Sequence, residues 1–240
     1  MLSIIGWTTL IPACAAADVD PQANSWVPVR QLSLKSFTND SDKDGKPFID
    51  RMVKAAGDLN DYSFNYEMNV FKKNRVISQG GNLEFKKPSK MRLEVTDGQN
   101  DGAVAVMTQP GKVKGHLGGV LSIFSGTVSD RSSYLRSINN WPMVESDFLS
   151  LAKAIRGYVY NDGKPTKVTS EPVEWQDGKK YYVVDLYEGQ PKRLWKRIAV
   201  DPGNLLPVYW IDYEEGQLWT YSLWKNVQLN PGIADSVFKL

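Results

Sequence analysis

Regular alternation of apolar and polar residues runs through much of the chain and predicts β-strands. Within residues 61–71 every second side chain is large and apolar: Tyr62, Phe64, Tyr66, Met68 and Val70. This period of two is typical of a strand with one buried face. Similar patterns predict strands over residues 82–86, 91–95, 103–107, 168–175, 180–187, 193–200, 205–213 and 217–227. Short connections, such as Asp177-Gly178, favour antiparallel pairing.

Two segments have the three- and four-residue spacing of amphipathic helices. The first runs from about Lys46 to Leu59, and the second follows a cap at Ser146 and ends near Tyr158. Their apolar stripes include Met52, Val53 and Ala56 in the first helix, and Phe148, Ala152 and Ile155 in the second. We expect these stripes to cover one face of the sheet. Simple packing in the core is an equally good interpretation.

The last strands carry apolar residues on both faces. In 217–227, Trp219, Tyr221 and Leu223 are expected to point one way and Trp224 the other. A strongly curved sheet around an apolar cavity explains this pattern, and so does a fully packed core. The candidate cavity residues are Phe64, Tyr66, Met68, Phe85, Leu93, Trp195, Trp210, Trp219, Tyr221 and Leu223.

The predicted fold class is therefore α+β. We expect a single strongly curved antiparallel sheet, an open half-barrel, with two main helices covering its concave side. The sequence offers no convincing linker, so this sheet and its helices are expected to form one domain.

Composition narrows the chemistry. The chain has one Cys and one His in 240 residues. These counts exclude an internal disulfide framework, cysteine-cluster zinc sites and multi-histidine metal sites. A formal net charge of +2 gives no indication of nucleic-acid binding. We expect no metal, no cofactor and a monomer.

A hydrolase site is the least favoured hypothesis. Because the chain has a single histidine, a Ser/His/Asp triad would have to use His116. The nearby candidates for its partners are Ser122 or Ser125 and Asp130. The chain has no G-x-S-x-G nucleophile elbow. We therefore expect no catalytic residues and no enzymatic activity.

The N-terminus predicts export. Residues 2–13 form an apolar run of signal-peptide length, too short to span a bilayer, and Ala15 and Ala17 give an A-x-A cleavage pattern. A lipoprotein leader ending at Ala13, with lipidation at Cys14, is the alternative. The first interpretation implies a periplasmic protein, and the second an anchor in the outer membrane. No Lys or Arg precedes the run, which departs from the usual signal-peptide pattern. A buried N-terminal strand is the third interpretation. No later segment approaches the length of a transmembrane helix.

Several short motifs carry a resemblance to a known superfamily. Lys87-Pro88-x-x-x-Arg92 follows the second strand, and Asp235-x-x-Phe238 closes the chain. With these motifs, residues 46–240 resemble the LolA/LolB-like superfamily of exported lipoprotein- and lipid-binding proteins. The run Arg197–Asp201 and Tyr221-x-x-Trp224 resemble more closely an uncharacterised bacterial domain-of-unknown-function family within it.

This resemblance implies a half-barrel whose apolar cavity accepts a lipid, or the acyl chains of a lipoprotein, without catalysis. The alternative is a structural or regulatory envelope protein of the same fold, with its cavity filled by side chains and a protein as its partner. The expected organisation is a signal peptide over 1–17, or a leader to Ala13, then an irregular segment over 18–45. The half-barrel domain follows over 46–240.

Overall fold

A computed structural model describes residues 36–38, 43–72, 75–118 and 125–240. Residues 1–17, Cys14 and much of the 18–45 segment therefore lie outside the described residues. The described chain forms one large antiparallel sheet with two α-helices, which confirms the predicted fold class. In sheet order the strands are β1 (Lys43–Asp44), β8 (Thr166–Val168), β10 (Lys180–Glu188), β11 (Arg193–Val200), β12 (Pro207–Glu214), β13 (Gln217–Leu229), β2 (Asp61–Lys72), β3 (Arg75–Lys86), β4 (Lys90–Gly98), β5 (Val104–Gln109), β6 (Lys112–His116) and β7 (Ser125–Ser129).

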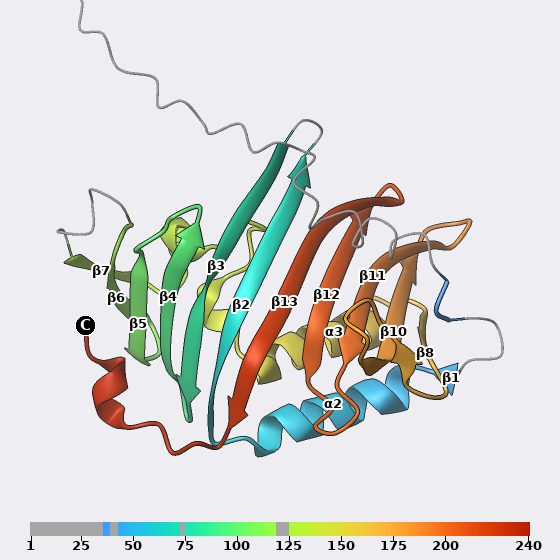
Figure 1. Ribbon diagram of the computed structural model, residues 1–240, viewed down its shortest axis with the longest axis horizontal. Coiled ribbons are helices and arrows are strands. Elements are labelled where there is room, and N and C mark those ends of the chain that lie inside the picture. The colour runs from blue at the N-terminus through green and yellow to red at the C-terminus, as the bar shows by residue number, and fades with distance from the viewer. Residues whose placement is uncertain (1–35, 39–42, 73–74, 119–124) are drawn as a thin grey trace, which may run out of the picture.

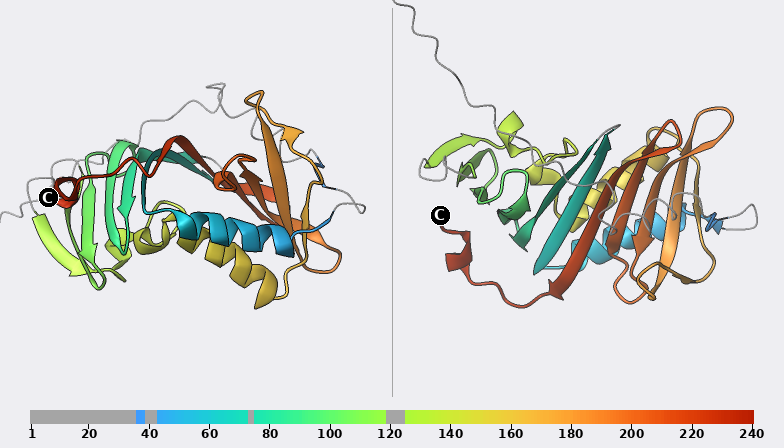
Figure 2. Two further views of the ribbon diagram at one scale, coloured as in Figure 1. Left: turned by 90° about the horizontal axis from the view of Figure 1, so that it is seen from below. Right: turned by 45° about the horizontal axis from the view of Figure 1, so that its top comes forward.

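The sheet is open rather than closed, and β9 (Val173–Glu174) pairs with β10 off the main path. β2 and β13, from opposite ends of the chain, are paired in the middle of the sheet (Figure 1). Seen from below, the sheet curves over the two helices, which lie side by side (Figure 2). The fold thus leaves the helices on the concave side, as predicted.

Helices α2 (Lys46–Asp58) and α3 (Phe148–Tyr160) pack on β2, β10 and β11. The Phe148 ring lies 4.8 Å from the Tyr62 ring and 5.0 Å from the Phe64 ring, centroid to centroid. The Tyr62 hydroxyl also accepts a hydrogen bond from the Phe148 backbone N–H at 2.8 Å. This bond satisfies one of the free N–H groups at the start of α3.

The cap of α3 differs from the prediction by one residue. Asp147 is the N-cap, and its carboxylate accepts a hydrogen bond from the Ser150 N–H at 3.0 Å. Ser146 instead donates from its hydroxyl to the Pro142 carbonyl. Both residue types cap helices well, so the sequence pattern does not distinguish neighbouring candidates.

The predicted apolar stripes of the helices lie in the main core. Five of the six candidate cover residues are at most 4% exposed: Met52, Ala56, Phe148, Ala152 and Ile155. The sixth, Val53, is partly buried against the same core. They pack on side chains of the sheet, as the core-packing interpretation predicted.

Two β-bulges change which way aromatic side chains point. Leu186 pairs with Lys196 and Tyr187 pairs with Leu194, so Trp195 is an extra residue in β11. In the same way, the pairing of β12 with β13 leaves Trp219 as an extra residue. A bulge reorients the side chain it carries. Trp195 and Trp219 therefore escape the strict alternation that the sequence pattern assumes.

A second apolar cluster covers the opposite, convex face of the sheet. It contains Phe71, Trp175, Tyr181, Val183, Ala199, Tyr209, Ile211, Tyr213 and Tyr221. The turn after β9 folds onto this cluster, where the Asp177 carboxylate accepts hydrogen bonds from the Tyr181 and Tyr209 hydroxyls. Phe37 stacks on Trp175 with centroids 5.0 Å apart. Both faces of the late strands are apolar because both are covered.

The sequence motifs at Lys87–Arg92 and Asp235–Phe238 meet in the structure. Asp235 forms ion pairs with Lys86 and Lys90 at 2.8 and 2.7 Å. Phe238 is 2% exposed and packs on Val104 and Val106 of β5. Lys86 and Lys90 therefore hold the C-terminal segment against the convex face.

The Asp235 contacts predict a dependence of stability on pH. Hydrogen bonds from Lys86 and Lys90 lower the pKa of Asp235 to about 2 from its ordinary value of 3.8. A lowered folded-state pKa stabilises the protein above the ordinary value, and this contribution is lost as the pH falls from about 4 through 2. Asp235→Asn is therefore expected to lower the melting temperature at pH 7, with the difference from wild type shrinking as the pH falls below 4 and vanishing below pH 2. The exposed Glu171→Gln serves as control, and a difference independent of pH would contradict the expectation.

Candidate ligand cavity

A cavity of about 940 Å³ lies on the concave side of the sheet, beside the two helices. Its walls are strands β2 to β7, parts of β10 to β13, and the connection between β7 and α3. The large apolar side chains that line it include Phe64, Tyr66, Met68, Leu83, Leu93, Val113, Val128, Leu135, Trp141, Met143, Trp195, Trp210, Trp219 and Trp224. This size and lining are typical of a site for an apolar ligand.

Seven of the ten predicted cavity residues line this space. They are Phe64, Tyr66, Met68, Leu93, Trp195, Trp210 and Trp219. Tyr221 and Leu223 instead belong to the cluster on the convex face. Because of the bulge at Trp219, the Trp219 side chain points into the cavity while Tyr221 and Leu223 point away from it. Trp224, which the sequence pattern places on the face opposite Trp219, also lines the cavity.

The tenth residue, Phe85, lies in a different place. Its ring stacks on Tyr62 with centroids 5.0 Å apart. Both side chains line a second, smaller cavity of about 480 Å³, near the turn between β3 and β4. Of the predicted cover residues, only Ala56 lines this smaller cavity, and none lines the larger one. Helix α3 contributes Leu151 to the larger cavity instead.

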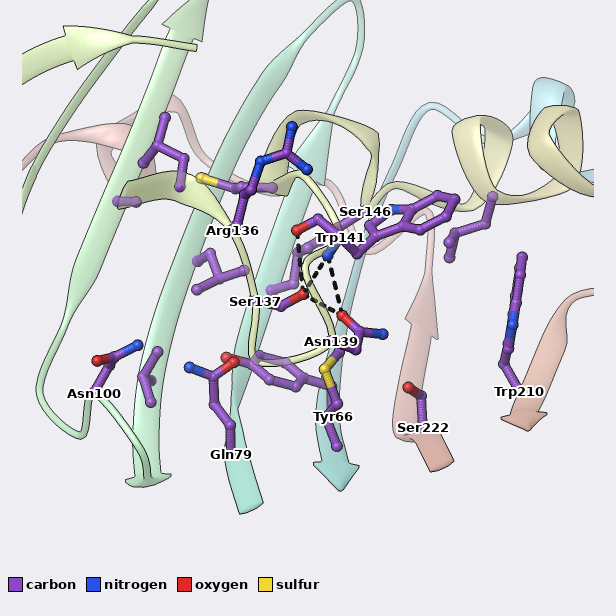
Figure 3. A pocket seen from close by; sticks show the side chains of 18 of the residues that line it. Tyr66, Gln79, Asn100, Arg136, Ser137, Asn139, Trp141, Ser146, Trp210 and Ser222 are labelled. Carbon is purple, nitrogen blue, oxygen red and sulfur yellow. Dashed lines mark hydrogen bonds between the residues drawn. The ribbon is translucent and has the colours of Figure 1, made fainter. Parts of the chain in front are cut away.

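The connection between β7 and α3 supplies a wall that the sequence pattern did not reveal. It contains the short 3₁₀ turns η2 (Ser133–Leu135) and η3 (Met143–Glu145). Between them, the Trp141 N–H donates to the Ser137 hydroxyl and to the Asn139 side-chain oxygen (Figure 3). The Trp141 ring lies 5.8 Å from that of Trp210, centroid to centroid, so the connection contacts β12. This connection has no regular apolar period, so periodicity does not identify it, and only Trp141 indicates an apolar contact.

Tyr66 lies flat on its cross-strand partner Gly81. A Cβ at position 81 would approach the Tyr66 hydroxyl to 2.8 Å and the Glu94 carbonyl oxygen to 2.0 Å, so only glycine fits there. The hydroxyl is buried without a hydrogen-bond partner among the described residues. Burial raises the pKa of Tyr66, so this side chain stays uncharged at neutral pH.

One end of the cavity is polar. The Lys196 ammonium pairs with the Asp212 carboxylate at 2.6 Å, and both residues line the cavity. Asp212 also accepts hydrogen bonds from the Trp210 indole N–H at 2.8 Å and the Thr220 hydroxyl at 2.7 Å. The cavity therefore combines a largely apolar wall with a buried ion pair.

The residues of the hydrolase hypothesis are not assembled. His116 and Ser125 are paired across β6 and β7, but the His116 ring nitrogen Nδ1 lies 3.3 Å from the Leu117 carbonyl oxygen. Asp130 accepts a hydrogen bond from the Gly111 N–H, at the other end of this hairpin. Ser122 lies outside the described residues. Within the described part of this hairpin, the geometry gives Ser125 no oriented base.

The described residues contain neither a metal-binding cluster nor a membrane-spanning helix. No group of three or more His, Cys, Asp or Glu side chains in the described ranges is placed to hold a metal ion. Within the same part of the chain, no helix has both the length and the apolar character needed to cross a bilayer.

Comparison with known proteins gives similarities at the level of fold. No protein-family model matches the chain, and no curated protein matches it. A DUF1329 family protein from Desulfovibrio piger is 12% identical, with a TM-score of 0.38 over 81% of this chain and 95% of that one. A LolA superfamily protein from Nitrosomonas europaea is 10% identical, with a TM-score of 0.41 over 82% of this chain and 98% of that one.

The complex of MucA and MucB from Pseudomonas aeruginosa also contains a similar chain. It is 11% identical, with a TM-score of 0.41 over 82% of this chain and 60% of that one. A LolA superfamily member and a DUF family member thus both occur among the similar structures. At these identities the similarity concerns the fold alone.

Proposed function

We propose that this protein is a non-enzymatic, exported envelope protein that binds a lipid, or the acyl chains of a lipoprotein, in its concave cavity. It acts as a carrier or a sensor. The observation that carries the proposal is the open volume of about 940 Å³ against a largely apolar wall. The apolar run in residues 2–13 and the superfamily resemblance of residues 46–240 support export and this ligand class.

Physical chemistry favours an acyl ligand for such a wall. Water in an apolar cavity forms few hydrogen bonds, and burial of a methylene group contributes about 0.8 kcal/mol. A chain that contacts the aromatic and aliphatic side chains between β2 and β7 gains this contribution along its length. Strong binding then needs no covalent chemistry.

Three large apolar side chains of the cavity lining are exposed to solvent. Leu117, Tyr134 and Trp219 are 45%, 74% and 38% exposed, and we call these three side chains the exposed rim. Exposed apolar groups often mark places where an apolar ligand or partner binds. These side chains are therefore candidates for the first contact with an acyl chain.

The alternative function is a structural or regulatory envelope protein that binds a protein partner. That hypothesis expected a cavity filled by side chains. The open volume favours the lipid-binding proposal instead, while the exposed rim would serve either kind of partner.

Affinity is expected to rise with acyl chain length. In displacement of a fluorescent apolar dye, each added methylene should tighten binding by up to about fourfold until the cavity is full. Saturated monoacylglycerols of increasing length, kept below their critical aggregation concentrations, are the probes. Displacement that does not depend on chain length, or no displacement at all, would count against an acyl site.

A further inference from the structure

Lys196 is a buried ammonium group in the wall of the cavity. The residue is 8% exposed, and three aromatic rings surround it. Its Nζ lies 4.2 Å from the Trp195 ring centroid, 5.3 Å from that of Tyr158 and 5.5 Å from that of Trp210. The rings and Asp212 together hold the ammonium group in one position.

The hydrogen-bonding capacity of Lys196 is only partly used. An ammonium group has three N–H donors. Among the described residues, the Asp212 carboxylate is the single acceptor that Lys196 reaches within hydrogen-bond distance. Asp212 itself is well satisfied, because it also accepts from Trp210 and Thr220. Lys196 therefore keeps donors for another acceptor in the cavity.

The surrounding charge selects the kind of acceptor. Lys196 and Asp212 are together neutral. Glu188 has two cations as neighbours, its ion-pair partner Lys164 at 3.4 Å and its cross-strand partner Arg193, whereas Glu214 and Glu215 add two exposed carboxylates to the lining. A carboxylate or phosphate placed beside Lys196 would meet the Asp212 carboxylate, which already shares that ammonium group. An uncharged carbonyl oxygen accepts the same hydrogen bond without that repulsion.

We propose that Lys196 recognises the carbonyl oxygen of an uncharged acyl ester or amide, with the hydrocarbon chain extending toward β2–β6. The proposal rests on the proposed function, since it names the polar part of the lipid that the cavity takes. In this proposal Lys196 is a specificity-determining residue. The apolar wall supplies affinity for any acyl chain, and the Lys196 ammonium distinguishes lipids by the polar group next to that chain.

The test compares two probes that differ only at the carbonyl. Monopalmitoylglycerol carries an ester, and its ether analogue hexadecylglycerol lacks the carbonyl oxygen. Wild-type protein is expected to bind the ester about tenfold more tightly than the ether, the usual effect of a hydrogen bond to a charged group. Palmitate, an anion with the same chain, is expected to bind more weakly than the ester.

In Lys196→Met the ratio of ester to ether affinity should fall to about one. Because this change leaves Asp212 without its cation, the double variant Lys196→Met/Asp212→Asn is measured beside it, with melting temperatures for both. Equal ester and ether affinities in wild type, or a ratio that survives in both folded variants, would overturn the role of Lys196. If wild type binds neither probe, the proposed function itself fails.

Discussion

Ala105→Trp is expected to reduce affinity for palmitoyl probes by at least about tenfold while the protein stays folded. Ala105 lies on β5, lines the cavity and is only partly buried. An indole at this position would occupy space that we assign to the acyl chain. Exclusion of two methylene groups alone removes about 1.6 kcal/mol, which corresponds to roughly fifteenfold in affinity.

The matched control is Thr108→Trp, at an exposed position of the same strand. It adds the same side chain outside the cavity, so its affinity for the probes should remain that of wild type. Dye displacement measures binding, and the melting temperature reports folding. Full binding by a folded Ala105→Trp variant would show that the acyl chain does not use this cavity.

Arg197→Met is expected to destabilise the fold by about 3–5 kcal/mol. Arg197 and Asp185 are 2% and 0% exposed, and their two hydrogen bonds measure 2.7 and 2.9 Å. The Thr38 hydroxyl donates a further bond to Asp185 at 2.8 Å. Loss of the guanidinium leaves the carboxylate buried without its cation. For a chain of this size the melting temperature should fall by roughly 6–20 °C.

The double variant Asp185→Leu/Arg197→Met separates the charge effect from packing. Because it removes both charges from the convex face, it should recover much of the lost stability. A double variant as unstable as Arg197→Met would mean that the guanidinium acts mainly by packing, for example on the Phe37 ring, which lies 4.9 Å away. Lipid binding should be unaffected in either variant that remains folded, since the pair lies on the face opposite the cavity.

The arrangement of strands and helices follows largely from sequence periodicity. The pattern in 61–71 predicts β2, observed over Asp61–Lys72, and the helix expected over Lys46–Leu59 is observed over Lys46–Asp58. Both segments are long and have one clearly apolar side, which is where periodicity is most informative. The strand expected over 168–175 is instead two short strands, β8 and β9, separated by a turn.

Strands β6 and β7 were not predicted, and β3 begins earlier than expected. β6 and β7 lie at one edge of the sheet, where most side chains are exposed. Their sequences, KVKGH and SGTVS, therefore contain few apolar residues and show no clear period. The first half of β3 has a similar polar and glycine-rich composition. Such strands are formed by pairing with their neighbours, which local sequence does not encode.

The candidate cavity was predicted in part, for a similar reason. Alternation within one strand identifies Phe64, Tyr66 and Met68 together, and all three line the cavity. Alternation fails in β13, because the bulge at Trp219 changes which of the neighbouring side chains share a face. Alternation also does not say which face of a strand is concave, so Tyr221 and Leu223 were assigned to the cavity although they face the convex cluster.

The most direct test of the central proposal is native mass spectrometry of the protein purified without detergent, together with extraction of bound lipids. Wild type is expected to carry a co-purified acyl lipid and Ala105→Trp markedly less, while Thr108→Trp should resemble wild type. Wild-type protein that is free of lipid and from which acyl probes displace no dye would contradict acyl binding in this cavity.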